Sequence, residues 1–253
     1  MINYADLMTK AARLRKDLGE DNTSPIDIMA LALSIENLTI VYYPMGDNLS
    51  GMCIKGHENS NVIALNSAMS LGRQRFSLAH EFYHLFYDDT MVAVCAKKID
   101  SGKETERSAD MFASYFLMPD AALQEKAEHY VKNRMDKQLE LNDVIRIEQY
   151  YGVSHQAAVY RLMHTPYLNN EKGSSYLNIS VRRLAETLGY SSDLYNPSSE
   201  KRRYMTYGNY IDLAEQVLSK ELVSYGKYEE LLLDAFRSDI VYGDEREDGD
   251  VID

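Results

Sequence analysis

The sequence predicts an α+β fold, with a small β-sheet beside one long helix, a helix-turn-helix-like segment, and a small helical C-terminal module. Three observations support this prediction. Residues 38–66 contain short apolar runs of strand length, separated by turn-forming residues. Residues 73–163 place apolar side chains three and four positions apart, which is typical of helices. Helical patterns return after a stretch rich in turn formers at 166–176.

The N-terminal part of the chain is predicted to hold two helices and three strands. One helix covers residues 4–18, where the leucines share one side. Ser24 is predicted to cap a second helix, with Pro25 and Asp27 in its first turn. The three strands are expected in LTIVYYP (38–44), GDNLSGMCIK (46–55) and NSNVIALN (59–66).

The middle of the chain is predicted to be helical. Helices are expected at 73–87, at 104–118 before Pro119, at 120–134, and at 139–163 with a break at YYGVS. The last pair forms a helix-turn-helix-like segment over 142–164, with Gly152 in the turn and Ser154 as the N-cap. The second helix of this pair is expected to pack beside the rest of the domain rather than to enter a DNA groove.

The chain is predicted to divide into three parts. Residues 1–165 form the main domain, residues 166–238 form a helical accessory module, and residues 239–253 form an acidic tail that is expected to be disordered. The accessory module carries helical patterns in NISVRRLAETLGY, YGNYIDLAEQVLSKEL and KYEELLLDAFRS.

Composition excludes several classes of protein. The net charge of −12 argues against direct binding to nucleic acid, which depends on an excess of Lys and Arg. The sequence contains neither a signal peptide nor an apolar run of about 20 residues, so a cytoplasmic protein without membrane contact is expected. The two cysteines, Cys53 and Cys95, are far apart, which predicts neither a disulfide framework nor a CxxC metal site.

The segment RFSLAHEFYHLFY contains the pattern HExxH. On a helix, His80 and His84 project from one face and can bind a single metal ion. Glu81 lies beside that face, where it can accept a proton from a water molecule on the metal without binding the metal itself. This spacing is typical of metalloproteases. The competing interpretation is a core helix with two hydrogen-bonded histidines.

A third ligand is expected because catalytic zinc sites use three protein ligands. The segment KETERSADMFASYFLMP offers Glu106, with Asp110 four residues later on the same helix face. Glu106 is predicted to bind the metal, while Asp110 accepts a hydrogen bond from an imidazole and fixes its orientation. Glu104 is the rival ligand, although it has no acidic partner at the same spacing.

The two motifs together resemble the ImmA/IrrE family of HExxH metallopeptidases. The pattern of that family is close to R-F-x-x-A-H-E-x-x-H, followed by E-x-x-A-[ND]-x-F-A-x-x-[LF]-[ML]-P, and the resemblance covers residues 25–164. It implies a zincin-like metallopeptidase domain with His80, His84 and Glu106 as ligands and Glu81 as general base. Zinc is the expected ion, although Mn²⁺ or Fe²⁺ also fits two histidines and one carboxylate.

The resemblance also implies a substrate: a specific intracellular regulator, such as a repressor or an antitoxin encoded nearby. Tyr83 departs from the family, where many relatives have a small pair of residues ending in Gly. Its phenol is a candidate for binding the oxyanion, as are Tyr160 and Arg161. The strand NVIALN is expected to offer an edge to which a peptide adds.

Two further possibilities stay open. One is a regulator without enzymatic activity, or a member of a toxin–antitoxin pair, in which the metal only shapes a binding surface. The other concerns Cys95, which lies between the two motifs. Its thiolate can in principle cap the metal, but a buried structural cysteine is the favoured interpretation.

Overall fold

The computed structural model describes residues 2–57, 60–96 and 104–243. Within these ranges the chain forms twelve α-helices and one mixed five-stranded sheet, which confirms the α+β prediction. In chain order the elements are α1 (Tyr4–Asp17), α2 (Ile28–Leu33), β1 (Leu38–Tyr43), β2 (Leu49–Lys55), β3 (Asn61–Asn66), α3 (Leu71–Tyr87), β4 (Val92–Ala96), α4 (Glu104–Leu117), α5 (Asp120–Val131), α6 (Leu141–Tyr151), α7 (His155–Met163), α8 (Asn170–Tyr176), α9 (Arg182–Thr187), β5 (Met205–Gly208), α10 (Asn209–Ser219), α11 (Tyr225–Asp234) and α12 (Ser238–Tyr242).

The sheet has the strand order β4-β2-β3-β1-β5. β1 and β3 are parallel, and the other neighbouring strands are antiparallel. β3 is therefore the central strand, and the prediction that NVIALN offers a free edge is wrong. Residues 63–65 of β3 are all buried, which explains the continuous apolar run in this central strand.

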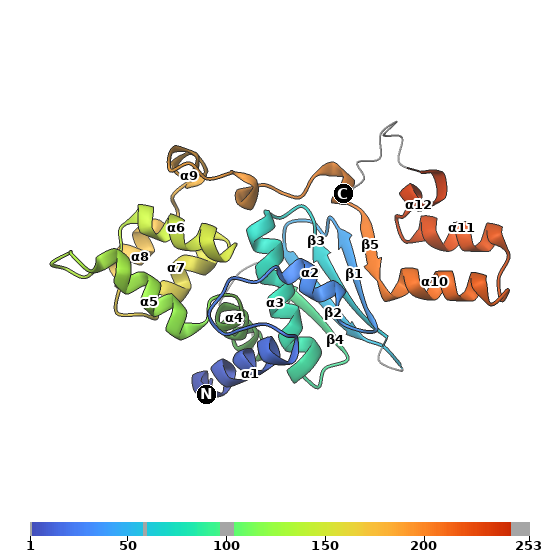
Figure 1. Cartoon of the computed structure of the whole chain (residues 1–253), viewed down its shortest axis with the longest axis horizontal. Coiled ribbons are helices and arrows are strands. Elements are labelled where there is room, and N and C mark those ends of the chain that lie inside the picture. Colours follow the sequence, from blue (N-terminus) through green and yellow to red (C-terminus); the bar gives the residue numbers. More distant parts are fainter. Residues whose placement is uncertain (1, 58–59, 97–103, 244–253) are drawn as a thin grey trace.

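Helices stack on the sheet in layers that bring the two sequence motifs together. α3 lies against β2 and β3, α4 packs on α3, and α1 packs on α4 (Figure 1). Ala109 and Ala113 on α4 are fully buried, and such small side chains allow neighbouring helices to approach closely. Phe82 meets Phe116 edge to face, with ring centroids 5.8 Å apart, and so fixes the two helices against each other.

Arg75 holds the beginning of α3 in place. Its Nε atom donates a hydrogen bond to the carbonyl of Gly152 at 2.9 Å, and one terminal nitrogen donates to the carbonyl of Ile26 at 2.5 Å. A charged side chain thus connects α3 to the segment before α2 and to the turn between α6 and α7. Because these contacts span distant parts of the sequence, they orient α3 relative to the helices around it.

The segment that was predicted to be helix-turn-helix-like contains two helices, α6 and α7. Ser154 caps α7 by accepting a hydrogen bond from the amide of Ala157, and Gly152 has the left-handed conformation (φ 65°) that ends α6. Of the nine residues of α7, only Gln156 is exposed, and its side chain accepts a hydrogen bond from Arg73. This burial favours packing over insertion of α7 into a DNA groove.

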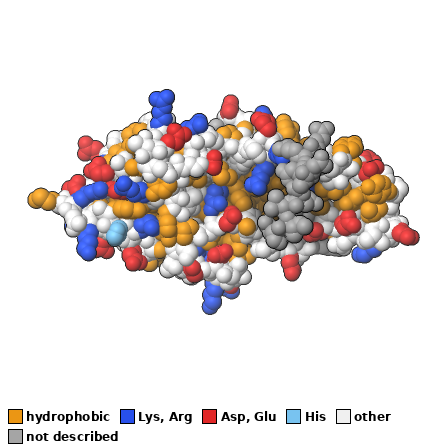
Figure 2. All heavy atoms as spheres, turned by 45° about the horizontal axis from the view of Figure 1, so that its top comes forward, with side chains coloured by type: hydrophobic (Ala, Val, Ile, Leu, Met, Phe, Trp, Pro, Cys, Tyr) orange, Lys and Arg blue, Asp and Glu red, His pale blue; other side chains and the backbone are white. Residues whose placement is uncertain are grey.

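The surface gives further information on binding partners. On the face shown in Figure 2, Lys and Arg side chains are interspersed with Asp and Glu and do not form a continuous basic stripe. Such a distribution does not match the basic track of a nucleic-acid-binding face. Among the described residues, no helix has the length and apolar character needed to cross a membrane.

The C-terminal part departs from the predicted all-helical module. β5 adds to β1 at the sheet edge, so this part of the chain completes the sheet, while α10–α12 lie beyond it (Figure 1). The predicted tail is wrong at its start, because α12 covers Ser238–Tyr242 and Arg237 binds Asp239 through two nitrogens. Residues 244–253 lie outside the described part. The division at residue 165 stays a prediction.

The start of α2 also differs from the prediction. Asp27, not Ser24, is the N-cap, because its carboxylate accepts from the amides of Met29 and Ala30. Ser24 instead donates its hydroxyl proton to Asp21. Serine and aspartate are both common N-caps. Asp27 takes this role, while the Ser24 hydroxyl is used in its hydrogen bond to Asp21.

Candidate metal centre

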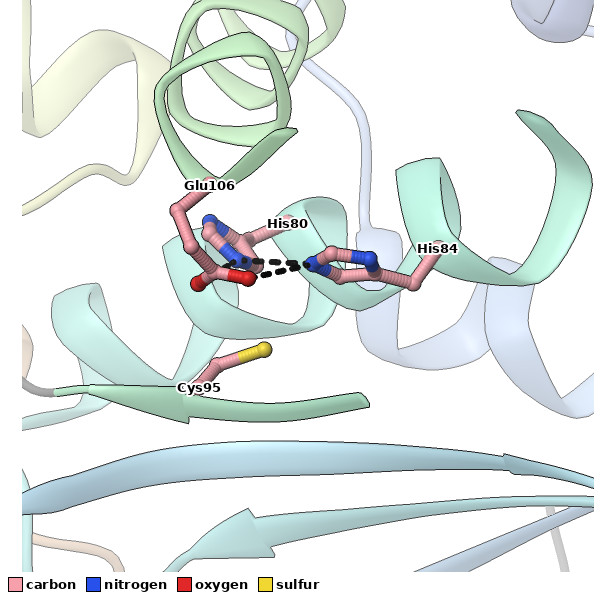
Figure 3. A group of neighbouring side chains, drawn as sticks. All are labelled: His80, His84, Cys95 and Glu106. Atoms are coloured by element: carbon pink, nitrogen blue, oxygen red, sulfur yellow. Dashed lines mark hydrogen bonds and ion pairs between the residues drawn. The ribbon is translucent and has the colours of Figure 1, made fainter. Parts of the chain in front are cut away.

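His80 and His84 lie one turn apart on the buried face of α3. Their side chains are 8% and 1% exposed, and their Nε2 atoms are 3.2 Å apart (Figure 3). Two nitrogens that bind one tetrahedral zinc ion at about 2.1 Å are separated by about 3.4 Å. The observed separation therefore fits two imidazoles that share one ion.

Glu106 reaches the same point from the first turn of α4. One carboxylate oxygen lies 3.5 Å from Nε2 of His80, and the other lies 3.5 Å from Nε2 of His84. The close α3–α4 contact places this carboxylate across from both rings (Figure 3). The three side chains predicted as ligands therefore converge in the structure, and their donor types suit zinc.

The outer nitrogens of both rings are held by carboxylates. Nδ1 of His80 lies 2.9 Å from Asp110, and Nδ1 of His84 lies 2.8 Å from Asp88. Each Nδ1–H donates to its carboxylate, which leaves the lone pair of each Nε2 directed inward. The structure thus places Asp110 where the sequence predicted it. Asp88 was missed, although its position four residues after His84 at the helix end was a usable signal.

The electrostatics of the site favour a cation. Burial alone lowers the pKa of His80, but its contacts with Asp110, Cys95 and Glu106 raise that pKa well above the usual value. The pKa of His84 is lowered by burial and by the neighbouring charge of His80. Two inward lone pairs and a carboxylate repel one another unless a positive charge lies between them. A proton serves this role without metal, and a metal ion must displace it.

We expect the carboxylates behind the rings to strengthen metal binding. Asp110→Asn and Asp88→Asn should each weaken zinc affinity by about 10–100-fold, because the amide no longer fixes the ring orientation and basicity. Competition with a chromophoric chelator measures this change. Asp89→Asn is the matched control, because Asp89 is exposed and follows Asp88 directly. Equal affinities in all three variants would contradict the role given to Asp88 and Asp110.

Glu81 lies beside the ligands but points toward the sheet. Its side chain is fully buried, Oε2 accepts a hydrogen bond from the Cys95 thiol at 3.4 Å, and Oε1 has no partner among the described residues. Burial raises the pKa of Glu81 to about 7, while His80 and the Cys95 thiol act in the opposite direction. Such a carboxyl group can both accept and release a proton near neutral pH.

Gly51 on β2 makes the space for the Glu81 carboxylate. A Cβ atom at this position would lie 2.8 Å from Oε1 of Glu81 and 3.0 Å from the carbonyl oxygen of Ala64. Both distances are shorter than normal carbon–oxygen contacts, so any larger residue displaces the carboxylate. Gly51 is a site residue that sequence reasoning missed, because only the three-dimensional pairing shows what it faces.

The other candidates occupy different surroundings. Tyr83 is half-buried, and its ring meets the edge of His84 and packs on Phe112, so its proposed oxyanion role stays a prediction. Tyr160 and Arg161 line a cavity of about 270 Å³ that also borders Asp110. Arg161 forms an ion pair with Asp120.

The described residues contain one cluster suited to a metal, formed by His80, His84, Cys95 and Glu106. Glu104, the rival ligand, is exposed at the start of α4 and is not part of it. From the sequence, Cys95 could be either a thiolate that caps the metal or a buried structural residue. The structure shows that it is both buried and adjacent to the ligands.

Comparison with known families agrees with this geometry. Residues 25–163, more than half of the chain, match the peptidase family described as the IrrE N-terminal-like domain. The match includes all three converging side chains and Glu81. No curated protein matches the chain. The chain therefore belongs to the IrrE N-terminal-like family of metal-dependent peptidases.

Proposed function

We propose that the protein is a zinc-dependent endopeptidase that cleaves a specific intracellular regulatory protein, such as a repressor or an antitoxin encoded nearby. One observation carries this proposal: His80, His84 and Glu106 converge on one point, and the buried Glu81 lies beside them. Mn²⁺ and Fe²⁺ also suit this donor set. When bound, the ion supplies a Lewis acid that acidifies water and polarises a carbonyl group.

The protein groups have separate tasks in this mechanism. Glu81 accepts a proton from the attacking water and later donates it to the leaving amine, as its shifted pKa allows. Asp110 and Asp88 keep the imidazoles oriented during this process. Tyr83 is proposed as an additional donor to the developing oxyanion after a change in its side-chain rotamer.

A substrate peptide is proposed to add to β4 instead of β3. In the described part of the chain, β4 pairs with β2 on one side and with no strand on the other. Val92 and Val94 are about half exposed, and Cys95 on the same strand belongs to the metal cluster. A peptide that extends the sheet at β4 therefore passes close to the ligands.

Cleavage of a partner tests the proposal. The zinc-loaded chain is incubated with the purified product of the neighbouring regulatory gene, and fragments are identified by mass spectrometry. We expect a defined cut that disappears after metal removal by a chelator and returns when zinc is restored. A partner that binds the metal-loaded chain and remains intact would favour the regulator without enzymatic activity.

Gly51→Ala should impair cleavage without removing the metal. The added methyl group pushes the Glu81 carboxylate from its position, and a misplacement of about 1 Å can cost on the order of 10²-fold in rate. Steady-state kinetics and metal analysis measure the two effects. Gly226→Ala is the control, because a Cβ atom there meets nothing within 4 Å. Unchanged kinetics in Gly51→Ala would remove Gly51 from its assigned role.

A further inference from the structure

Cys95 brings a thiol into the group of side chains that bind the metal. Its side chain is fully buried, and it pairs with Gly51 across the β2–β4 ladder, so both face α3. Figure 3 shows its Sγ atom directed toward His80, His84 and Glu106. The four ligand atoms all lie within 4.8 Å of one another. Cysteine, histidine and carboxylate are all common zinc ligands.

Glu81 supplies a second and independent observation. Its carboxyl group is fully buried, and Oε1 has no partner among the described residues. A buried carboxylate oxygen without a partner is costly in the interior. The Cys95 thiol donates a hydrogen bond to the other oxygen, Oε2, at 3.4 Å. This contact holds the sulfur atom beside the site, where it faces the two imidazoles (Figure 3).

We propose that the Cys95 thiolate is the fourth ligand of the resting metal centre and closes it to water. This inference rests on the proposed function and concerns its regulation. When the metal binds, the S–H bond breaks, a metal–sulfur bond forms, and the proton is released to the solvent. The Glu106 carboxylate and the Cys95 thiolate together balance the two charges of the ion, so the buried centre is neutral. Four protein ligands are the pattern of closed zinc sites.

The closed centre is inactive because sulfur fills the position that water needs. Hydrolysis therefore requires Cys95 to leave the metal and to take up a proton. Because Cys95 belongs to the edge strand β4, a peptide that pairs with this strand acts directly on the backbone that carries the thiol.

Absorption spectroscopy of the cobalt(II)-loaded full chain tests the ligand assignment. We expect a near-ultraviolet thiolate-to-cobalt charge-transfer band in the wild type and its loss in Cys95→Ser. Cys53→Ser is the matched control and keeps the band, because Cys53 is equally buried on β2 but lies outside the cluster. A wild type without the band, or a band that persists in Cys95→Ser, overturns the proposal.

X-ray absorption of the zinc-loaded wild type gives a test that needs no variant. One sulfur at about 2.3 Å from zinc is expected, and a shell of nitrogen and oxygen alone overturns the proposal. Basal cleavage by Cys95→Ser should exceed that of the wild type. If sulfur binds the metal but neither protein cleaves the partner, the ligand assignment stands and the proposed peptidase function fails.

Discussion

Glu81→Gln is expected to lower kcat/KM for the protein substrate by roughly 10²–10⁴-fold, the usual contribution of a general base. The amide has nearly the same shape but cannot accept a proton from water. Metal content should stay at the wild-type level, because the ligand cluster does not include Glu81. The fall in kcat/KM is then caused by impaired proton transfer and not by loss of the metal.

Two measurements separate these effects. Cleavage kinetics report the chemical step, while metal analysis of the purified variant reports the ligand set. Glu36→Gln is a suitable control, since Glu36 is exposed in the turn before β1 and its replacement should leave both quantities unchanged. Cleavage by Glu81→Gln at the wild-type rate would exclude Glu81 as the base, and loss of metal would make it a ligand.

Glu106→Ala is expected to weaken zinc binding by more than about 100-fold, because loss of an outer carboxylate alone costs about 10–100-fold. Only two imidazoles and a thiol then remain near the ion. The carboxylate is the one acidic group that lies 3.5 Å from both Nε2 atoms in the described structure. Cleavage should disappear in parallel with the metal.

Glu104→Ala provides the matched control for this experiment. Glu104 lies on the same first turn of α4 but is exposed and outside the cluster, so metal affinity should not change. Isothermal titration of both variants compares the two carboxylates directly. Weak binding in Glu104→Ala with normal binding in Glu106→Ala would reverse the ligand assignment.

The metal centre was predictable to the extent that it follows from helix periodicity. His80 and His84 lie on one helix face because they are four residues apart. Glu106 and Asp110 lie on one face of α4 for the same reason. The sequence could not show that α4 packs against α3, because that contact depends on small and aromatic side chains fitting together. Family resemblance supplied this long-range information, and the structure agrees with it.

The sheet was predicted less completely. β4 and β5 have five and four residues and were not recognised as strands, because short runs carry little periodicity. β3 looked like an edge because the chain order of the first three strands does not show that β3 pairs with both β1 and β2. The role of Gly51 depends on the β2–β4 pairing, which places it and Cys95 next to Glu81. Pairing between strands is a non-local property that local patterns do not encode.

The most direct test is a crystal structure of the zinc-loaded protein with anomalous scattering at the zinc edge. We predict one ion, with Nε2 of His80 and of His84 at about 2.0–2.1 Å and an oxygen of Glu106 at about 2.0–2.2 Å. An ion bound elsewhere, or Glu106 directed away from an ion held by the two histidines, would contradict the metal centre described for this protein.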